Sequence, residues 1–175
     1  MKGVIFNSLA EAIIEIGGED MWDDLLVRAG LSGAYTSLGS YDEGDLALLI
    51  GAAAEVLDVS EEEATVYAGR LVTPKLADRH SDLVASHTDT ISLLCDLNDV
   101  IHPEVRKLYP NAQVPDFTTL HRGPDQLVLR YQSERNLVSL ATGLILGAAE
   151  LFDETVEIET EPTEGGCIFR LEFKR

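Results

Sequence analysis

The chain has 175 residues, with 13 Lys and Arg against 31 Asp and Glu, and a formal net charge of −18. A surface this acidic repels nucleic acid and anionic membranes, so neither is expected as a partner. Hydrophobic residues make up 45% of the chain, which suits one folded domain with a substantial core and argues against disorder.

Targeting and cysteine patterns point to the cytoplasm. The first residues, MKGVIFNSLAEAII, lack the pattern of a signal peptide, and no run of about 18 apolar residues predicts a transmembrane helix. Cys95 and Cys167 belong to no CxxC or CxxH pair, so we expect neither a disulfide framework nor a structural zinc site. A reducing compartment is the simplest expectation.

The first half of the chain has the periodicity of helices. Apolar residues recur at helical spacing up to Gly17-Gly18, and Ser60 with Glu63 forms a capping-box pattern that opens a later helix. Pro74 predicts a break in that later helix. In chain order, the predicted helices cover residues 5–16, the stretch around 22–26, 43–57, 60–71, and a further stretch from the break to about 87.

The segment from 89 to 109 is helical in pattern but contains an unusual motif, VIHPEV, at 100–105. His102 lies on the apolar face of this segment and directly precedes Pro103. Proline disfavours the α conformation of the residue before it and removes an amide donor. His102 is therefore either a packed core histidine beside a helix kink or a ring needed for chemistry.

The last third of the chain changes to alternating patterns that predict strands. These strands are QLVLRYQSER at 126–135, TVEIET at 155–160 and CIFRLEF at 167–173, and EPTEGG joins the last two as a hairpin. One helix is expected from about 136 to 152, where Gly143 and Gly147 would allow close approach of another backbone or a flat ligand. The predicted fold class is α+β, with a helical N-terminal part and a C-terminal antiparallel sheet with one long helix.

Three residues of YQSER suggest an anion clamp. Alternate side chains of an extended segment point the same way, so Tyr131, Ser133 and Arg135 would converge. Two hydroxyls and a guanidinium can hold a carboxylate or a phosphate. The alternative is an ordinary strand with a polar face.

Taken together, His102 and the clamp suit haem, because iron takes an axial histidine and the propionates need cationic and hydroxyl donors. The sequence gives little support for zinc, nucleophile or nucleotide-binding sites. His80, His87 and His121 are scattered without zinc-binding spacing, and GxSxG, Walker A and GxGxxG motifs are absent. Carboxylates are abundant, so a catalytic pair remains open, although most of them should be solvated.

At this point the sequence resembles the H-NOX family, the haem nitric oxide/oxygen binding domains related to the sensor domain of soluble guanylate cyclase. The resemblance runs nearly end to end, through MKGVIFN, MWDDLLVRAGL, DVIHPEVRKLYP, the YxSxR pattern of YQSER, GLILGAAELF and GGCIFRLEF. It implies one H-NOX domain over 1–175, with a distal helical subdomain at about 1–60, a proximal α+β subdomain at 61–175, and haem between them.

The resemblance also implies roles for individual residues. His102 would be the proximal ligand of a b-type haem iron, and Tyr131, Ser133 and Arg135 would bind its propionates. Pro115, in AQVPDF, matches the proline with which family members press on the haem and distort it. Some bacterial members carry a C-terminal cysteine cluster, of which only Cys167 is present, so a zinc or thiol switch is not expected.

The distal side of the haem would decide which gas is bound. Oxygen-binding members have a tyrosine that donates a hydrogen bond to O₂, and the matching position here is Leu140. Bound O₂ gains from a donor whereas NO does not need one, so the pocket should favour NO and CO. Thr73 lies nearby and could contribute a hydroxyl. The other expected distal residues are Ile5, Leu9, Val72 and Leu144.

The function implied is a gas sensor rather than an enzyme. NO would weaken the iron bond to His102, and the release of this histidine would change the surface shown to a partner, by family precedent a histidine kinase or a cyclic-di-GMP enzyme. Two alternatives stay open: a haem enzyme such as a peroxidase or an NO dioxygenase, and a haem-free interaction module.

Overall fold

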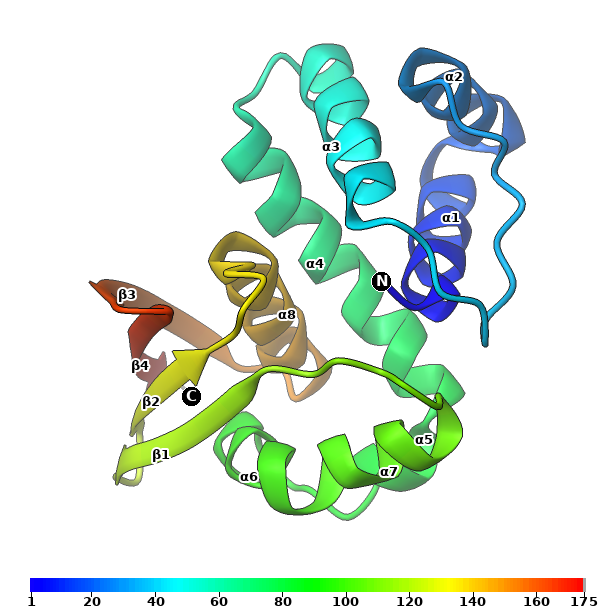
Figure 1. Ribbon diagram of the computed structural model, residues 1–175. Coiled ribbons are helices and arrows are strands. Elements are labelled where there is room, and N and C mark those ends of the chain that lie inside the picture. The colour runs from blue at the N-terminus through cyan, green and yellow to red at the C-terminus, as the bar shows by residue number, and fades with distance from the viewer. Residues whose placement is uncertain (175) are drawn as a thin grey trace.

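The computed structural model describes residues 1–174, which form eight α-helices, one π-helical turn and a four-stranded antiparallel sheet (Figure 1). The helices are α1 (Gly3–Gly17), α2 (Glu19–Ala29), α3 (Glu43–Leu57), α4 (Glu61–Arg79), α5 (Ser81–Val84), α6 (Thr90–Cys95), α7 (His102–Leu108) and α8 (Val138–Leu151), and the π-helical turn is η1 (Leu97–Ile101). The strands are β1 (Asp116–Arg122), β2 (Gln126–Gln132), β3 (Thr155–Thr163) and β4 (Gly166–Lys174). The predicted α+β class is confirmed.

The helices α1, α2 and α3 pack with α4 around an apolar core of their own. Local signals place their ends. The Asp42 carboxylate caps α3 by accepting from the amide of Gly44, and Gly30 ends α2 in the left-handed conformation with a φ of 69°. Ser60 and Glu63 form the predicted capping box at the start of α4. Phe6, which is fully buried in this core, stacks on Tyr35 from the loop after α2.

The break predicted at Pro74 is wrong, because α4 runs through this proline without interruption. A proline inside a helix loses one backbone hydrogen bond, a cost of about 3 kcal/mol or more. The turns that follow the proline are held by tertiary contacts, since Leu76 packs against the helical core. Lys75 and Arg79 form ion pairs with Glu15 and Glu11 of α1, which hold the last turns of α4 in place. Tertiary contacts therefore override the local signal.

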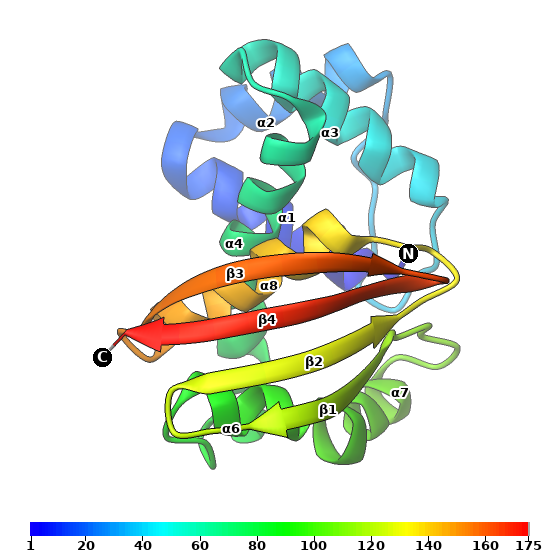
Figure 2. The same ribbon diagram turned by 90° about the vertical axis from the view of Figure 1, so that its left-hand side faces the viewer.

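The sheet has the order β1-β2-β4-β3, with all neighbours antiparallel. Figure 2 shows one face of the sheet turned outward, with α8 and α6 behind the other. Alternation along β2 and β4 places apolar side chains on the covered face, as at Leu127, Leu129 and Phe169, which are fully buried. The hairpin predicted between β3 and β4 is confirmed, with Gly165 at a φ of 76°.

Two features of the sheet differ from expectation. The edge strand β1 was not predicted, because its only buried residue is Phe117 and its exposed residues show no alternation. The strand predicted over 126–135 ends at Gln132, and Asn136 then takes a positive φ of 46° that turns the chain toward α8. Ser133 and Arg135 therefore lie in a turn rather than in an extended strand.

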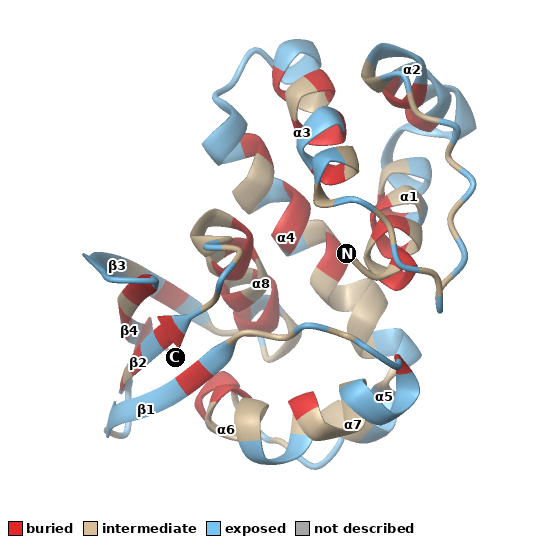
Figure 3. Cartoon of the chain, viewed as in Figure 1, coloured by how far each residue is buried: buried red, intermediate tan, exposed pale blue. Residues whose placement is uncertain are grey.

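The helix α8 lies between the two cores and is buried along most of its length (Figure 3). Leu140 belongs to the helical core, whereas Ala141 and Ile145 belong to the core under the sheet. Gly143 is pressed against α4, since a Cβ on it would lie 2.1 Å from the carbonyl oxygen of Val66. The close approach expected at this glycine is therefore to another backbone and not to a flat ligand.

None of the helices formed by residues 1–174 is both long and apolar enough to cross a membrane. The division into subdomains at about residue 60 stays a prediction. The helix α4, just after that position, contributes Ala64, Ala68 and Val72 to the core that it shares with α1, α2 and α3.

Candidate cofactor-binding site

A cavity of about 550 Å³ lies where the helical core and the sheet core meet. Its walls come from α1, α4, α8, the η1–α7 segment and the turn after β2. The volume falls in the range of about 300–1,000 Å³ that is typical of sites for small molecules and cofactors. Most of the lining is apolar, and a few polar side chains project into it, including those of His102, Tyr131, Ser133 and Arg135.

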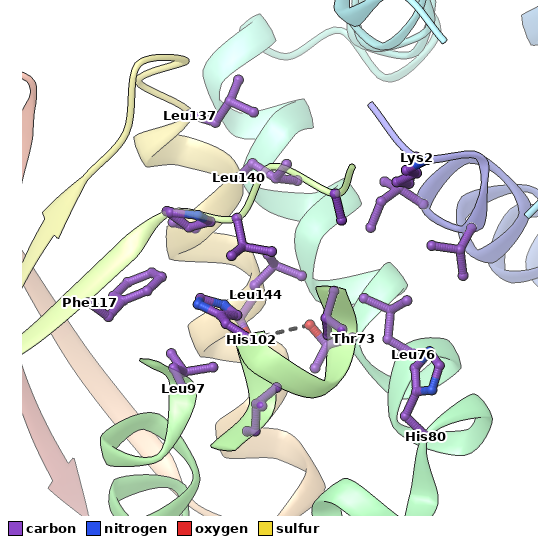
Figure 4. A pocket seen from close by; sticks show the side chains of 18 of the residues that line it. Lys2, Thr73, Leu76, His80, Leu97, His102, Phe117, Leu137, Leu140 and Leu144 are labelled. Carbon is purple, nitrogen blue, oxygen red and sulfur yellow. Dashed lines mark hydrogen bonds between the residues drawn. The ribbon is translucent and has the colours of Figure 1, made fainter. Parts of the chain in front are cut away.

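His102 is the first residue of α7, and its side chain lies between those of Phe117 and Leu144 (Figure 4). The residue is only 8% exposed. Burial lowers the pKa of the imidazole to about 4, and the positive charge of Arg106 acts in the same direction, whereas Asp116 and the Pro115 backbone oppose the shift. The ring is therefore neutral at physiological pH, which is the form that binds a metal ion.

The Nδ1 atom of His102 is buried and has no hydrogen-bond partner among the residues that the structure describes. The Pro115 backbone lies close enough to affect the pKa but does not meet the geometry of a hydrogen bond to Nδ1. A buried polar atom without a partner is costly, so such atoms are rare in proteins and are concentrated at functional sites. This observation favours the functional interpretation of His102 over that of a satisfied core histidine.

The local backbone explains how His102 can precede a proline inside a helical segment. The π-helical turn η1 ends at Ile101, so Pro103 falls in the first turn of α7, where a missing amide hydrogen costs little. The amide of His102 donates to the carbonyl of Leu97, five residues earlier. His102 keeps α conformation, with φ −64° and ψ −37°. Wide turns of this kind are frequent at functional sites.

The predicted clamp residues all line the cavity, although two of them follow the strand. The Tyr131 hydroxyl accepts from the amide of Leu137 at 3.1 Å, and the Ser133 hydroxyl accepts from the amide of Arg135 at 3.2 Å. Both hydroxyls keep their own hydrogen for a further acceptor. The Arg135 guanidinium pairs with Glu43 of α3 at 3.1 Å and donates to the Gln113 carbonyl.

The apolar wall of the cavity includes three of the five residues expected on the distal side, Ile5, Leu140 and Leu144, while Pro115 lines another part of the cavity. Leu9 and Val72 do not line it. They are 3% and 1% exposed and lie in the helical core behind it. Val72 precedes the lining residue Thr73 by one position, which is a rotation of about 100° around a helix.

Thr73 lines the cavity, but its hydroxyl is already engaged with backbone. Its Oγ1 lies 3.0 Å from the Gly69 carbonyl oxygen and 3.3 Å from the Leu144 carbonyl oxygen, and donates its one hydrogen to these acceptors (Figure 4). The hydrogen therefore points into the packing between α4 and α8, and donating to a ligand in the cavity would require breaking these contacts.

Several lining residues were not found from the sequence. Phe117 of β1 lies beside His102, with ring centroids 6.2 Å apart. His80, at the end of α4, forms a 2.9 Å hydrogen bond with the Tyr109 hydroxyl just after α7. The two residues are 29 positions apart, and no short-range spacing signals such a pair. The tertiary structure brings them together by placing the C-terminal end of α4 near that of α7.

These residues fit a haem. A neutral buried imidazole suits an axial position, Arg135 with two hydroxyls suits the propionates, and aliphatic walls suit the macrocycle. Among residues 1–174, no three His, Cys, Asp or Glu side chains are grouped as they are around a metal ion held by protein alone. Cys167 is buried within the sheet core, and burial raises the pKa of its thiol.

Comparison with known proteins identifies the class of protein. The family model described as Haem-NO-binding matches residues 2–160, so the chain belongs to this family. An H-NOX protein from S. oneidensis, solved in the Fe(II)NO ligation state, is 31% identical with a TM-score of 0.90, and the alignment covers 100% of both chains. An unliganded Fe(II) H-NOX protein from K. algicida is 27% identical with a TM-score of 0.84, over 100% of this chain and 97% of that one.

Curated relatives extend the comparison to animals. The soluble guanylate cyclase gcy-34 of Caenorhabditis elegans is 25% identical over 157 residues, which are 86% of this chain and 23% of that protein. This chain thus spans about a quarter of the length of that relative. It is a haem-binding gas-sensor domain of the H-NOX family, and the resemblance drawn from its motifs is confirmed.

Proposed function

We propose that this domain senses NO, also binds CO, binds O₂ poorly, and signals to a separate partner protein. The observation that carries the proposal is the apolar wall built by α1 and α8. Ile5, Leu140 and Leu144 have no polar atoms in their side chains, and the Thr73 hydroxyl beside them donates to backbone carbonyls. This wall offers a bound diatomic ligand space but no ready hydrogen bond.

Different residues of the cavity would bind different parts of b-type haem. His102 would hold the iron, and Tyr131, Ser133 and Arg135 would hold the propionates. Pro115 contacts the macrocycle from the segment between Tyr109 and β1. Ile5, Leu140 and Leu144 form the distal wall, and Leu9 and Val72 support it from the helical core. Ferrous iron, when bound, supplies the coordination position for the gas.

Selectivity follows from the charge of the ligand. Dioxygen bound to ferrous iron carries partial negative charge and gains from a donor, whereas NO and CO bind without one. A hydrogen bond to a charged acceptor contributes about 1.5–3 kcal/mol, a factor of roughly 10 to 150 in affinity. Because the distal wall lacks such a donor, O₂ loses this contribution and NO and CO do not.

The signal would begin at His102 and reach the partner as a change in the protein surface. If His102 were released when a gas binds, α7, which begins at this residue, would be free to move, and the subdomain of residues 1–60 would shift against residues 61–175. The Arg135–Glu43 ion pair joins these two parts, so its geometry changes with the shift. The partner that reads the new surface is a histidine kinase or a cyclic-di-GMP enzyme.

An absorption spectrum tests the proposal. The purified protein is reconstituted with haem, reduced, and exposed separately to O₂, CO and NO. We expect a Soret band that shifts with CO and with NO and stays unchanged in O₂ on the time scale of the measurement. A protein that acquires no Soret band would contradict haem binding, and a stable O₂ spectrum would contradict the proposed selectivity.

A further inference from the structure

Asn98, in the π-helical turn η1, holds the backbone of strand β1 from outside the sheet. Its side-chain amide donates to the Phe117 carbonyl at 3.0 Å, and its side-chain oxygen accepts from the Phe117 amide at 3.0 Å. The same amide group donates to the Asp116 carboxylate at 3.0 Å. Asn98 thus occupies both main-chain groups of one residue, as a neighbouring strand would.

The position of Phe117 explains why these main-chain groups are free to bind a side chain. β1 is the edge strand of the sheet, and only its other side pairs with β2. Along an edge strand, some amide and carbonyl groups point away from the sheet and need other partners. Asn98 supplies them for Phe117 and so fastens η1 to the edge of the sheet.

The orientation of the His102 ring depends on the groups that surround it. A metal-bound histidine is usually oriented by a hydrogen bond from its other ring nitrogen to a carbonyl or a carboxylate. In this protein the Pro115 backbone lies near the buried Nδ1 but does not meet the geometry of a hydrogen bond to it. The position of the ring is therefore determined by the backbone that carries it and by the side chains packed around it, of which Phe117 is one.

Asn98 holds both the backbone that carries the His102 ring and the Phe117 residue that packs against it. It lies in the turn that leads directly into His102, so it holds the backbone on the N-terminal side of the ring. It also holds Phe117, which packs against the ring and follows Pro115 by two residues. Leu97 and Ile101, on either side of Asn98 in η1, line the cavity, while Asn98 binds the sheet edge. One side chain therefore connects the ligand segment to the segment that carries Pro115.

We propose that Asn98 is the positioning residue of the haem site: by pairing with the Phe117 backbone it sets the placement of the His102 ring relative to the cavity. This inference rests on the proposed role of His102 as the axial ligand. Asn98 itself touches neither the iron nor the gas. It acts through η1 and Phe117.

The test compares Asn98→Ala with the wild type in the reduced, gas-free state by resonance Raman spectroscopy. We expect the iron–His102 stretching band to move to lower frequency and to broaden, because the ring is no longer held in one position. In the haem-free proteins, amide hydrogen exchange of Phe117 and of residues 97–103 should become roughly threefold to tenfold faster, the factor that corresponds to loss of one ordinary hydrogen bond.

Three further variants complete the test: one replaces Asn98→Ala if that variant does not fold, and two are controls. Asn98→Asp retains the acceptor for the Phe117 amide but loses the donor and faces Asp116, so it should shift the band in the same direction and serves if Asn98→Ala does not fold. Asp116→Ala removes the third contact of Asn98, together with the bond from the Thr118 hydroxyl, and keeps both bonds to Phe117, so it should leave the band in place. Val156→Ala, in the sheet core and away from the cavity lining, controls for a general loss of stability and should also leave it in place.

The outcomes separate this inference from the proposed function. A wild-type protein without a Soret band would overturn the proposed function. A normal wild-type band that is unchanged in frequency and width in Asn98→Ala would overturn the positioning role while the sensor proposal stands. An equal shift in Val156→Ala would show a structural effect alone, and a full shift in Asp116→Ala would assign the effect to that carboxylate; either result overturns the positioning role.

Discussion

The two walls of the cavity are built in opposite ways. The first wall is formed by α1, α4 and α8. Its α4 and α8 are held by direct backbone contact, as at Gly143 against Val66, and the Thr73 hydroxyl on it is engaged with carbonyl oxygens. The wall of η1 and α7 contains a π-helical turn and a buried histidine nitrogen without a partner, and it is fastened through side chains such as Asn98. Under the proposed function, the first wall would determine which gas fits and the second would hold the iron through His102.

The largest expected effect comes from removing the chemistry of the second wall. His102→Gly should abolish the axial histidine bond while leaving the first wall intact. We expect the reduced protein to lose the wild-type spectrum and to regain a histidine-like spectrum when imidazole is added, because the vacated space accepts the free ring. A wild-type spectrum in His102→Gly without imidazole would show that another residue ligates the iron.

The close packing of α4 against α8 in the first wall can be disrupted at Gly143. In Gly143→Ala the new methyl group would lie 2.1 Å from the Val66 carbonyl oxygen, so α4 and α8 must separate. We expect a loss of about 3 kcal/mol or more in the free energy of urea unfolding. The matched control is Gly51→Ala in α3, where a Cβ meets nothing closer than 3.8 Å and alanine should stabilise the helix by about 0.5–1 kcal/mol.

The buried imidazole makes the stability of the haem-free protein depend on pH. The folded-state pKa of His102 is lowered from 6.5 to about 4, so between these values the unfolded chain binds more protons and stability falls as the pH falls. The loss is up to about 3 kcal/mol and is complete near pH 4. Urea unfolding at pH 7 and 4.5 measures it, and His102→Gln should lose less over this range by about 2–3 kcal/mol. Equal losses in the two proteins would contradict the assignment to His102.

The selectivity assigned to the first wall can be changed by one hydroxyl group. Leu140→Tyr places a donor on this wall, and we expect O₂ affinity to rise by roughly 10- to 150-fold, the factor that corresponds to about 1.5–3 kcal/mol for a hydrogen bond to a charged acceptor. Leu140→Phe is the matched control, because it adds the ring without the hydroxyl. A similar gain in both variants, measured by O₂ titration of the reduced protein, would assign the effect to pocket shape instead.

The difference between the walls also separates what the sequence predicts from what it does not. Helix ends at Gly30 and Ser60, the strands β2, β3 and β4, and the apolar surroundings of His102 follow from periodicity and caps that span only a few residues. The continuity of α4 through Pro74 does not, because the ion pairs that hold its last turns reach 60 and 68 residues back along the chain to α1. The edge strand β1 does not either, because Phe117 is its only buried residue and the others show no alternation.

The candidate site shows the same division. The sequence by itself determined that one histidine lies on an apolar face, that a tyrosine, a serine and an arginine follow it in the order typical of the family, and that Leu140 carries no hydrogen-bond donor. Only the tertiary structure decided that the Thr73 hydroxyl donates to backbone, that Leu9 and Val72 lie behind the wall, and that Asn98 holds Phe117. Each of these outcomes depends on which way a side chain points at a contact between two helices or between a helix and the sheet. That direction is decided only when the two segments pack together.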